Sequence, residues 1–86
     1  MDIRGNRFGA GILVKVLITD GNERAALAVT RALGGEQVEV IVGAESQRSL
    51  AGSSRYCRQS IAYPSPYQEP ERFIATLMEA VQTHRV

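Results

Sequence analysis

Four consecutive residues offer the first chemistry in this sequence of 86 residues: Asp20, Gly21, Asn22 and Glu23. They follow an apolar run and precede a stretch in which apolar residues recur with helical spacing. In open α/β sheets, ligands bind beyond the carboxyl ends of the strands, where helix N-termini offer free N–H groups to anions. The four residues are therefore candidates for substrate binding. The same rule selects the segment after the next apolar run, where Ser46 is the candidate residue.

The glycine patterns that cradle phosphates do not occur in the sequence. Neither the dinucleotide fingerprint GxGxxG nor the phosphate loop GxxxxGKS/T is present. Asp20 and Glu23 would also repel a phosphate placed beside them. A simpler role for Asp20 and Asn22 is to cap the following helix and to hold the turn. The binding and the capping interpretations both stay open at this level.

Arg55 is the remaining candidate for substrate binding. Its guanidinium could meet a carboxylate or phosphate through two parallel hydrogen bonds, or it could form a structural salt bridge. Cys57 is the only cysteine, and His84, the only histidine, stands close to the end of the sequence. No Cys-His pair and no thiolate cluster is indicated, so we predict neither a catalytic residue nor a metal ligand. Tyr63 is expected to pack against the Pro-Ser-Pro turn that follows it.

The elements that must position these residues are those of one small α/β domain. Apolar, β-branched runs predict parallel strands at 12–19, 37–42 and 58–63. Helical spacing predicts helices at 22–33 and 70–84. Alternating strands and helices predict a three-layer, Rossmann-like arrangement with the strands in spatial order 3-2-1. Residues 1–11 are polar and glycine-containing, and we expect them to be a flexible lead-in to a domain at 12–86.

Each predicted helix has one apolar face, which we expect to cover the sheet. On the first helix this face is formed by Ala25, Ala28, Val29, Ala32 and Leu33. On the second it is formed by Phe73, Ile74, Leu77, Met78 and Val81. Leu27 lies outside the first face and is a mild sign of an interface. A further short helix at 47–51, capped by Ser46, is expected between the second and third strands.

Charge and hydropathy argue against several classes of partner. Ten basic and nine acidic residues give a net charge of +1, so no electrostatic footprint for nucleic acid or an anionic membrane is present. No apolar run approaches the ~20 residues that a membrane helix needs. The N-terminal residues contain no continuous apolar core of signal-peptide length. We therefore expect a cytoplasmic protein with no nucleic-acid or membrane partner.

Three segments in order carry a resemblance to a known family: VLITDGNERAALAVTRALG, VEVIVGAESQRSLAGSSRYCRQS and YPSPYQEPERFIATL. Together they resemble the N-terminal domain of ATP-grasp proteins, in the group similar to the carbamoyl-phosphate synthase large subunit. The similarity spans residues 14–84. It implies a pre-ATP-grasp, Rossmann-like domain that serves as scaffold and as one wall of the acceptor-substrate site. It also implies that ATP and magnesium are held by other domains, so this chain has no cofactor and is not an enzyme by itself.

In the resembled family the sheet continues past the first strand with a fourth one, and we expect this chain to stop before it. Val14, Val16 and Ile18 would then present unpaired backbone groups at an open edge. The expected partner is the missing set of ATP-grasp domains or a second copy of this chain at that edge. A free-standing Rossmann-like module for a small ligand or nucleotide, and an oligomerising relic without ligand, are alternatives. A receiver-type signalling domain is disfavoured, because the third strand ends at Tyr63 where that class needs an aspartate.

Overall fold

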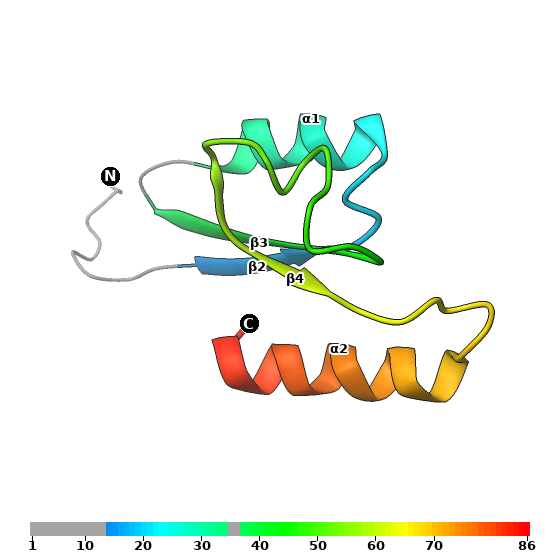
Figure 1. The fold of residues 1–86 in the computed structure, drawn as a ribbon. Coiled ribbons are helices and arrows are strands. Elements are labelled where there is room, and N and C mark those ends of the chain that lie inside the picture. Colours follow the sequence, from blue (N-terminus) through cyan, green and yellow to red (C-terminus); the bar gives the residue numbers. More distant parts are fainter. Residues whose placement is uncertain (1–13, 35–36) are drawn as a thin grey trace.

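The computed structural model describes residues 14–34 and 37–86 (Figure 1). Its elements in chain order are β2 (Val14–Ile18), α1 (Arg24–Leu33), β3 (Val38–Ala44), β4 (Cys57–Ala62) and α2 (Pro70–His84). Both strand pairs are parallel and the spatial order is β2-β3-β4, which confirms the predicted parallel sheet and its 3-2-1 order. The predicted lead-in at 1–11 and the start of the predicted 12–19 strand lie outside the described residues.

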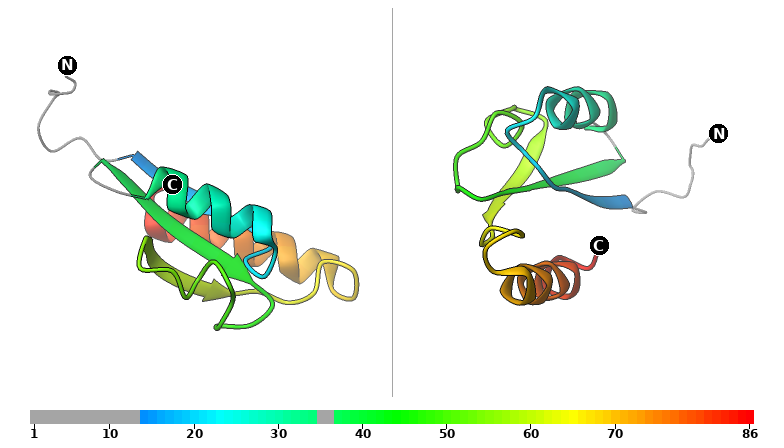
Figure 2. Two further views of the ribbon diagram at one scale, coloured as in Figure 1. Left: turned by 90° about the horizontal axis from the view of Figure 1, so that it is seen from above. Right: turned by 90° about the vertical axis from the view of Figure 1, so that its right-hand side faces the viewer.

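The central strand β3 forms the core. Val40, Ile41 and Val42 have no exposed surface. Because successive side chains of a strand point to opposite faces, Val40 and Val42 share one face, where they cluster with Ala26 of α1. Ile41 points to the other face. Figure 2 shows α1 and α2 on opposite faces of the sheet, so each face of β3 has its own helix. Burying one such side chain contributes roughly 1.5–3 kcal/mol.

The face that α1 turns to the sheet differs from the predicted one. Ala26 and Thr30 are buried and Leu27 packs against the core, whereas Val29 is 43% and Leu33 38% exposed. The predicted alanines of that face, Ala25, Ala28 and Ala32, are also exposed. Thr30 can be buried because its hydroxyl donates to the Ala26 carbonyl at 2.7 Å within the helix. The predicted apolar face is wrong, since Leu27 is a core contact and a threonine fills the centre.

The apolar face of α2 is only half covered. The Phe73 ring meets the Tyr63 ring edge to face, with centroids 4.9 Å apart, and Ala80 is buried. Ile74 and Met78, in contrast, are 55% and 60% exposed, and Val81 is 39% exposed. The predicted helix at 70–84 is confirmed in its bounds. Its predicted apolar face is therefore partly surface.

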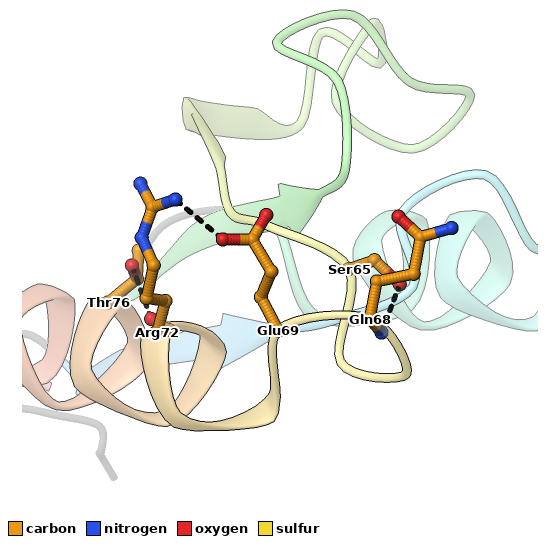
Figure 3. Close-up of polar contacts among 5 residues, drawn as sticks. All are labelled: Ser65, Gln68, Glu69, Arg72 and Thr76. Carbon is orange, nitrogen blue, oxygen red and sulfur yellow. Dashed lines mark hydrogen bonds and ion pairs between the residues drawn. The ribbon is translucent and has the colours of Figure 1, made fainter.

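Polar contacts order the start of α2 (Figure 3). The Ser65 hydroxyl oxygen accepts the amide N–H of Gln68 at 3.2 Å in the preceding turn. The Arg72 guanidinium lies 2.6 Å from the Glu69 carboxylate, and the Thr76 hydroxyl donates to the Arg72 carbonyl at 2.8 Å. These groups are exposed, so the ion pair contributes at most about 1 kcal/mol. The helix itself begins at Pro70 without a side-chain capping bond, so these contacts are local to its surface.

The segment between β3 and β4 contains turns and bends instead of the predicted helix at 47–51. The Ser46 hydroxyl accepts only the Arg48 amide, at 3.3 Å, and so caps a local turn. The Gln47 side-chain amide donates to the Ser60 carbonyl at 2.7 Å, and the Ser60 hydroxyl donates back to the Gln47 carbonyl at 2.7 Å. Bonding to β4 thus replaces the i to i+4 bonds of a helix.

Gly21 joins this segment to the ends of two strands. Its N–H donates to the Gly43 carbonyl at 3.0 Å, and its carbonyl accepts the Ala51 N–H at 2.7 Å. A β-carbon at Gly21 would lie 2.6 Å from the Ser49 hydroxyl oxygen and 2.7 Å from Cγ1 of Val42. Real β-carbons do not approach other atoms so closely, so the side chains of Ser49 and Val42 leave no room for a side chain at Gly21.

We therefore expect Gly21→Ala to lower the free energy of unfolding by about 1–3 kcal/mol, the usual penalty for overpacking a core. Urea unfolding followed by circular dichroism measures the change. Asn22→Ala is the matched control, since it removes one exposed hydrogen bond to the Leu50 amide and should lose about 1 kcal/mol or less. Equal midpoints for Gly21→Ala and the wild type would contradict the close packing at Gly21.

Candidate functional site

The carboxyl ends of the three strands meet around a hollow of about 340 Å³, here termed the carboxyl-end pocket. Its lining residues are Asp20, Gly21, Asn22, Glu23, Ala44, Glu45 and Tyr63. Parallel strands bring their carboxyl ends to one edge of the sheet, and this is the usual ligand position in open α/β sheets. The pocket therefore unites the four candidates that follow the first strand.

The turn after β2 is built by backbone geometry. Asp20 has φ 56°, in the left-handed region that aspartate enters more readily than most residues. Its carbonyl accepts the Glu23 N–H at 2.9 Å, which closes the turn. The side chain of Asn22 accepts the Leu50 N–H at 3.1 Å. Glu23 itself precedes α1, without a side-chain capping bond. Asp20 and Asn22 thus hold the turn as predicted, but the capping interpretation is wrong.

Tyr63 forms the far wall of the pocket. Its hydroxyl oxygen accepts the Asp20 backbone N–H at 2.9 Å, which connects the end of β4 to the turn after β2. Burial raises the pKa of this hydroxyl above its ordinary value of 10.0. The hydrogen bond from Asp20 opposes that shift, and the negative charges of Asp20 and Glu45 add to it. The group stays protonated at neutral pH and can donate its hydrogen to a ligand.

The charge of the pocket is acidic. Asp20, Glu23 and Glu45 contribute carboxylates, and no lysine or arginine is among the lining residues. Such a lining disfavours phosphate and favours a cationic or hydrogen-bond-donating group. Across residues 14–34 and 37–86, no group of three or more His, Cys, Asp or Glu side chains is arranged to hold a metal ion. The arrangement can orient a ligand, but it contains no nucleophile paired with a base.

Two candidates lie apart from the pocket. Ser46 is exposed and binds the Arg48 amide, while its neighbour Glu45 takes the lining position. Arg55 stands before β4, at the amino ends of the strands, and lines a separate hollow of about 540 Å³. Its guanidinium carbon lies 5.0 Å from the centre of the Tyr56 ring, and it also donates to the Tyr56 hydroxyl. Arg55 therefore does not share a site with Asp20.

Tyr63 is the residue that sequence reasoning missed, because its place beside Pro64 suggested a packing role. It does pack, against Phe73, but its hydroxyl reaches the pocket. The strand-end rule contained the signal, since Tyr63 directly follows the last residue of β4 just as Glu45 follows β3. Applying that rule to all three strands would have selected Tyr63.

Cys57 is half-buried and packs against the core cluster of Val40. Burial raises the pKa of its thiol above 9.0, while hydrogen bonds to the backbone of Val42 and Gln59 oppose the shift. Because the thiolate is the nucleophilic form, a raised pKa lowers the reactivity of this cysteine at neutral pH. Its environment is that of a structural residue.

No family model, curated protein or solved structure matches this chain. Among the residues that the structure describes, no helix combines the length and apolar character needed to cross a membrane.

We expect Tyr63→Phe to lower the free energy of unfolding by about 1 kcal/mol near neutral pH, because the partly buried Asp20 N–H loses its acceptor. Urea unfolding measures the loss. Tyr67→Phe, at a side chain that is 91% exposed, is the matched control and should leave the midpoint unchanged. Equal effects of the two substitutions would show that the Asp20 bond does not stabilise the fold.

The raised pKa of Tyr63 also gives a pH dependence with a definite sign. The folded state prefers the neutral hydroxyl, so its stabilisation is complete below the unfolded pKa near 10.0 and is lost as pH rises through the higher folded pKa. We expect the stability difference between wild type and Tyr63→Phe to shrink between about pH 9 and about pH 11. A difference that grows over this range would contradict the assigned direction.

Proposed function

We propose that this chain is the N-terminal, substrate-side domain of an ATP-grasp ligase of the carbamoyl-phosphate synthase large-subunit-like group. The proposal includes a Rossmann-like fold and a cytoplasmic location. It is supported by the three resembling segments, which cover the turn at Asp20, the segment at Ser49 and the start of α2. These same segments build the carboxyl-end pocket and the elements around it. In this role the domain is a scaffold and one wall of the acceptor site.

The observation that carries the proposal is the acidic lining of the carboxyl-end pocket. A domain that holds ATP by itself offers cations and glycine-rich backbone amides to the phosphates. Here the N–H of Gly21 is already bonded to Gly43, and the surrounding side chains are carboxylates. The pocket suits an amine or hydroxyl of an acceptor, which Glu23 and Glu45 would attract and Tyr63 would help orient.

The proposal also assigns a division of labour. Activating a carboxylate as an acyl phosphate needs bound ATP and magnesium, which the resemblance assigns to other domains. This chain then contributes orientation of the acceptor, a role in which a fixed pocket wall lowers the entropic part of the barrier. The competing nucleotide-binding module is disfavoured by the same acidic lining. An oligomerising domain without ligand is favoured by a different surface, the exposed apolar side chains of α1 and α2 beside β2.

Amide chemical shifts of the ¹⁵N-labelled chain test the acceptor role. A panel of small amines and amino acids should perturb the signals of Gly21, Asn22, Glu45 and Tyr63 in a saturable manner. Glu45→Gln should weaken this binding about two- to fivefold, as loss of one partly exposed charge does. Arg58→Gln, in the distant hollow, is the matched control and should leave it unchanged. Perturbations confined to residues outside the pocket would contradict the proposal.

Magnesium-ATP provides the complementary test. We expect calorimetric titration of the chain with magnesium-ATP to show no binding at micromolar concentrations, because carboxylates line the pocket at the strand ends. Heat of binding with a dissociation constant of about 1 μM, near −8 kcal/mol, would refute the assigned division of labour. If a small anion binds, the sequence predicts a position near Gly21 and Asn22 or near Arg55, and the acidic lining favours Arg55. Phosphate titration locates it.

A further inference from the structure

Exposed apolar side chains of α1 gather on one flank of the helix. Val29 and Leu33 are 43% and 38% exposed, and Ala25 is exposed one turn earlier. Together with Leu17 and Ile18 of β2, Ala25 and Val29 line an open groove of about 450 Å³. This flank of α1 therefore overhangs the β2 side of the sheet.

Exposed apolar side chains of α2 also lie on the β2 side of the sheet. The flank that contains Thr76 and Thr83 forms a hollow with Ile61 of β4 and so faces the β4 side. At 3.6 residues per turn, Ile74 and Met78 lie on the flank of α2 opposite Thr76 and Thr83. Val81 lies between that opposite flank and the side of the helix that faces the sheet. This second flank faces away from β4, toward the β2 side. It carries the most exposed aliphatic side chains of α2.

The edge of β2 lies between these two flanks. The Val14 N–H donates to the Gln37 carbonyl at 2.9 Å, so Val14 turns its backbone groups to β3. In a parallel pair alternate residues face the same neighbour, so Val16 and Ile18 do likewise while Lys15 and Leu17 face outward. The expectation that Val14, Val16 and Ile18 present the open groups is wrong. Lys15 and Leu17 present them.

The opposite edge of the sheet is treated differently. There the outward carbonyl of Ser60 accepts the side-chain amide of Gln47 at 2.7 Å, and a second bond returns from the Ser60 hydroxyl. The segment after β3 thus provides a hydrogen-bond partner for the outward carbonyl of β4 at Ser60. For β2, no partner for its outward groups is found within residues 14–34 and 37–86. An edge of this kind, beside apolar surface, is a template for strand pairing.

We propose that a second copy of this chain pairs with β2, antiparallel, about a two-fold axis perpendicular to the sheet. Lys15 of one copy lies opposite Leu17 of the other, with the two Val16 residues at the axis. This register pairs the outward backbone groups and keeps the two lysines apart. Because the axis is perpendicular to the sheet, the face that α1 covers in one copy continues into the same face of the other copy. The two copies of α1 then lie beside each other on one face, and the two copies of α2 on the other face. One symmetry operation therefore covers all three apolar surfaces.

Charge on α2 is complementary under this operation. Two antiparallel copies of α2 that meet at Met78 bring Glu71, in the first turn of one copy, near Arg85, the C-cap residue of the other, since both residues stand seven positions from Met78. Ile74, four positions before Met78 in one copy, then lies near Val81, three positions after Met78 in the other. Both charges are exposed in the single chain. An apolar centre between two matched ion pairs is what a self-complementary interface requires, and it favours a second copy over an unrelated partner.

Sedimentation equilibrium, from about 1 μM to about 1 mM chain, tests the proposal. We expect a mass twice the 9.4 kDa of the chain at the upper end. Met78→Glu should weaken dimerisation at least about tenfold, because it buries a charge without a partner. Thr83→Glu, exposed on the opposite flank, is the matched control and should not change it. Circular dichroism checks that both variants remain folded.

Charge reversal and amide exchange locate the interface. Glu71→Arg and Arg85→Glu should each weaken the dimer about two- to fivefold, and the double variant should recover the wild-type affinity. The amides of Lys15 and Leu17 should exchange slowly with deuterium in the dimer and fast in Met78→Glu. A chain that stays monomeric at about 1 mM overturns the proposal. A dimer in which Met78→Glu has no effect, or in which those two amides exchange fast, overturns it equally.

Discussion

The burial of β3 is the constraint on which the rest of this structure depends. With three strands described, only the middle one has a neighbour on each side, and its Val40-Ile41-Val42 segment is fully buried. Both faces of that segment need cover, and the chain supplies one helix for each. The N–H groups of Gly21 and Tyr63 donate to the Gly43 and Ala44 carbonyls at the end of this strand, and the Ala51 N–H in turn donates to the Gly21 carbonyl. The pocket therefore forms because these hydrogen bonds hold the neighbouring segments against the end of β3.

The sequence was sufficient for β2, β3, α1 and α2 because each has a local pattern of apolar residues. The β-branched residues at 37–42 identified β3 although Glu39 interrupts them, and Pro70 with the spacing of Phe73 and Leu77 identified α2. The buried face of α1 was not predictable by counting apolar residues. Alanine adds little apolar area, so a face made mainly of alanines competes poorly with the single large side chain of Leu27. Thr30 could take the centre because its own helix satisfies its hydroxyl.

The candidate site was predictable where backbone topology decides it and unpredictable where side chains decide it. Topology brings the residues after β2 and β3 together. The candidates from Asp20 to Glu23 were selected correctly, whereas Ser46 was selected after β3 and its neighbour Glu45 lines the pocket. Whether Ser46 or Glu45 faces the pocket depends on the bends that follow β3, which have no helical period. The reach of Tyr63 to Asp20 is a contact over 43 residues, and no local pattern encodes it. Arg55 precedes β4 and so lies at the amino ends of the strands, a position that the strand-end rule does not select.

The two edges of the sheet have different consequences for function. At the β4 edge, Gln47 uses its side chain to bond Ser60, and this also holds the segment whose Ala51 amide fixes Gly21. Covering that edge and shaping the pocket are thus one structural task. The β2 edge is linked to the pocket differently, because the groove beside β2 and the carboxyl-end pocket share Asp20 and Glu23 as lining residues. The outward backbone groups of Lys15 and Leu17 lie earlier in the strand than these two residues. In the proposed dimer, the partner at β2 would therefore border the proposed ligand pocket at Asp20 and Glu23.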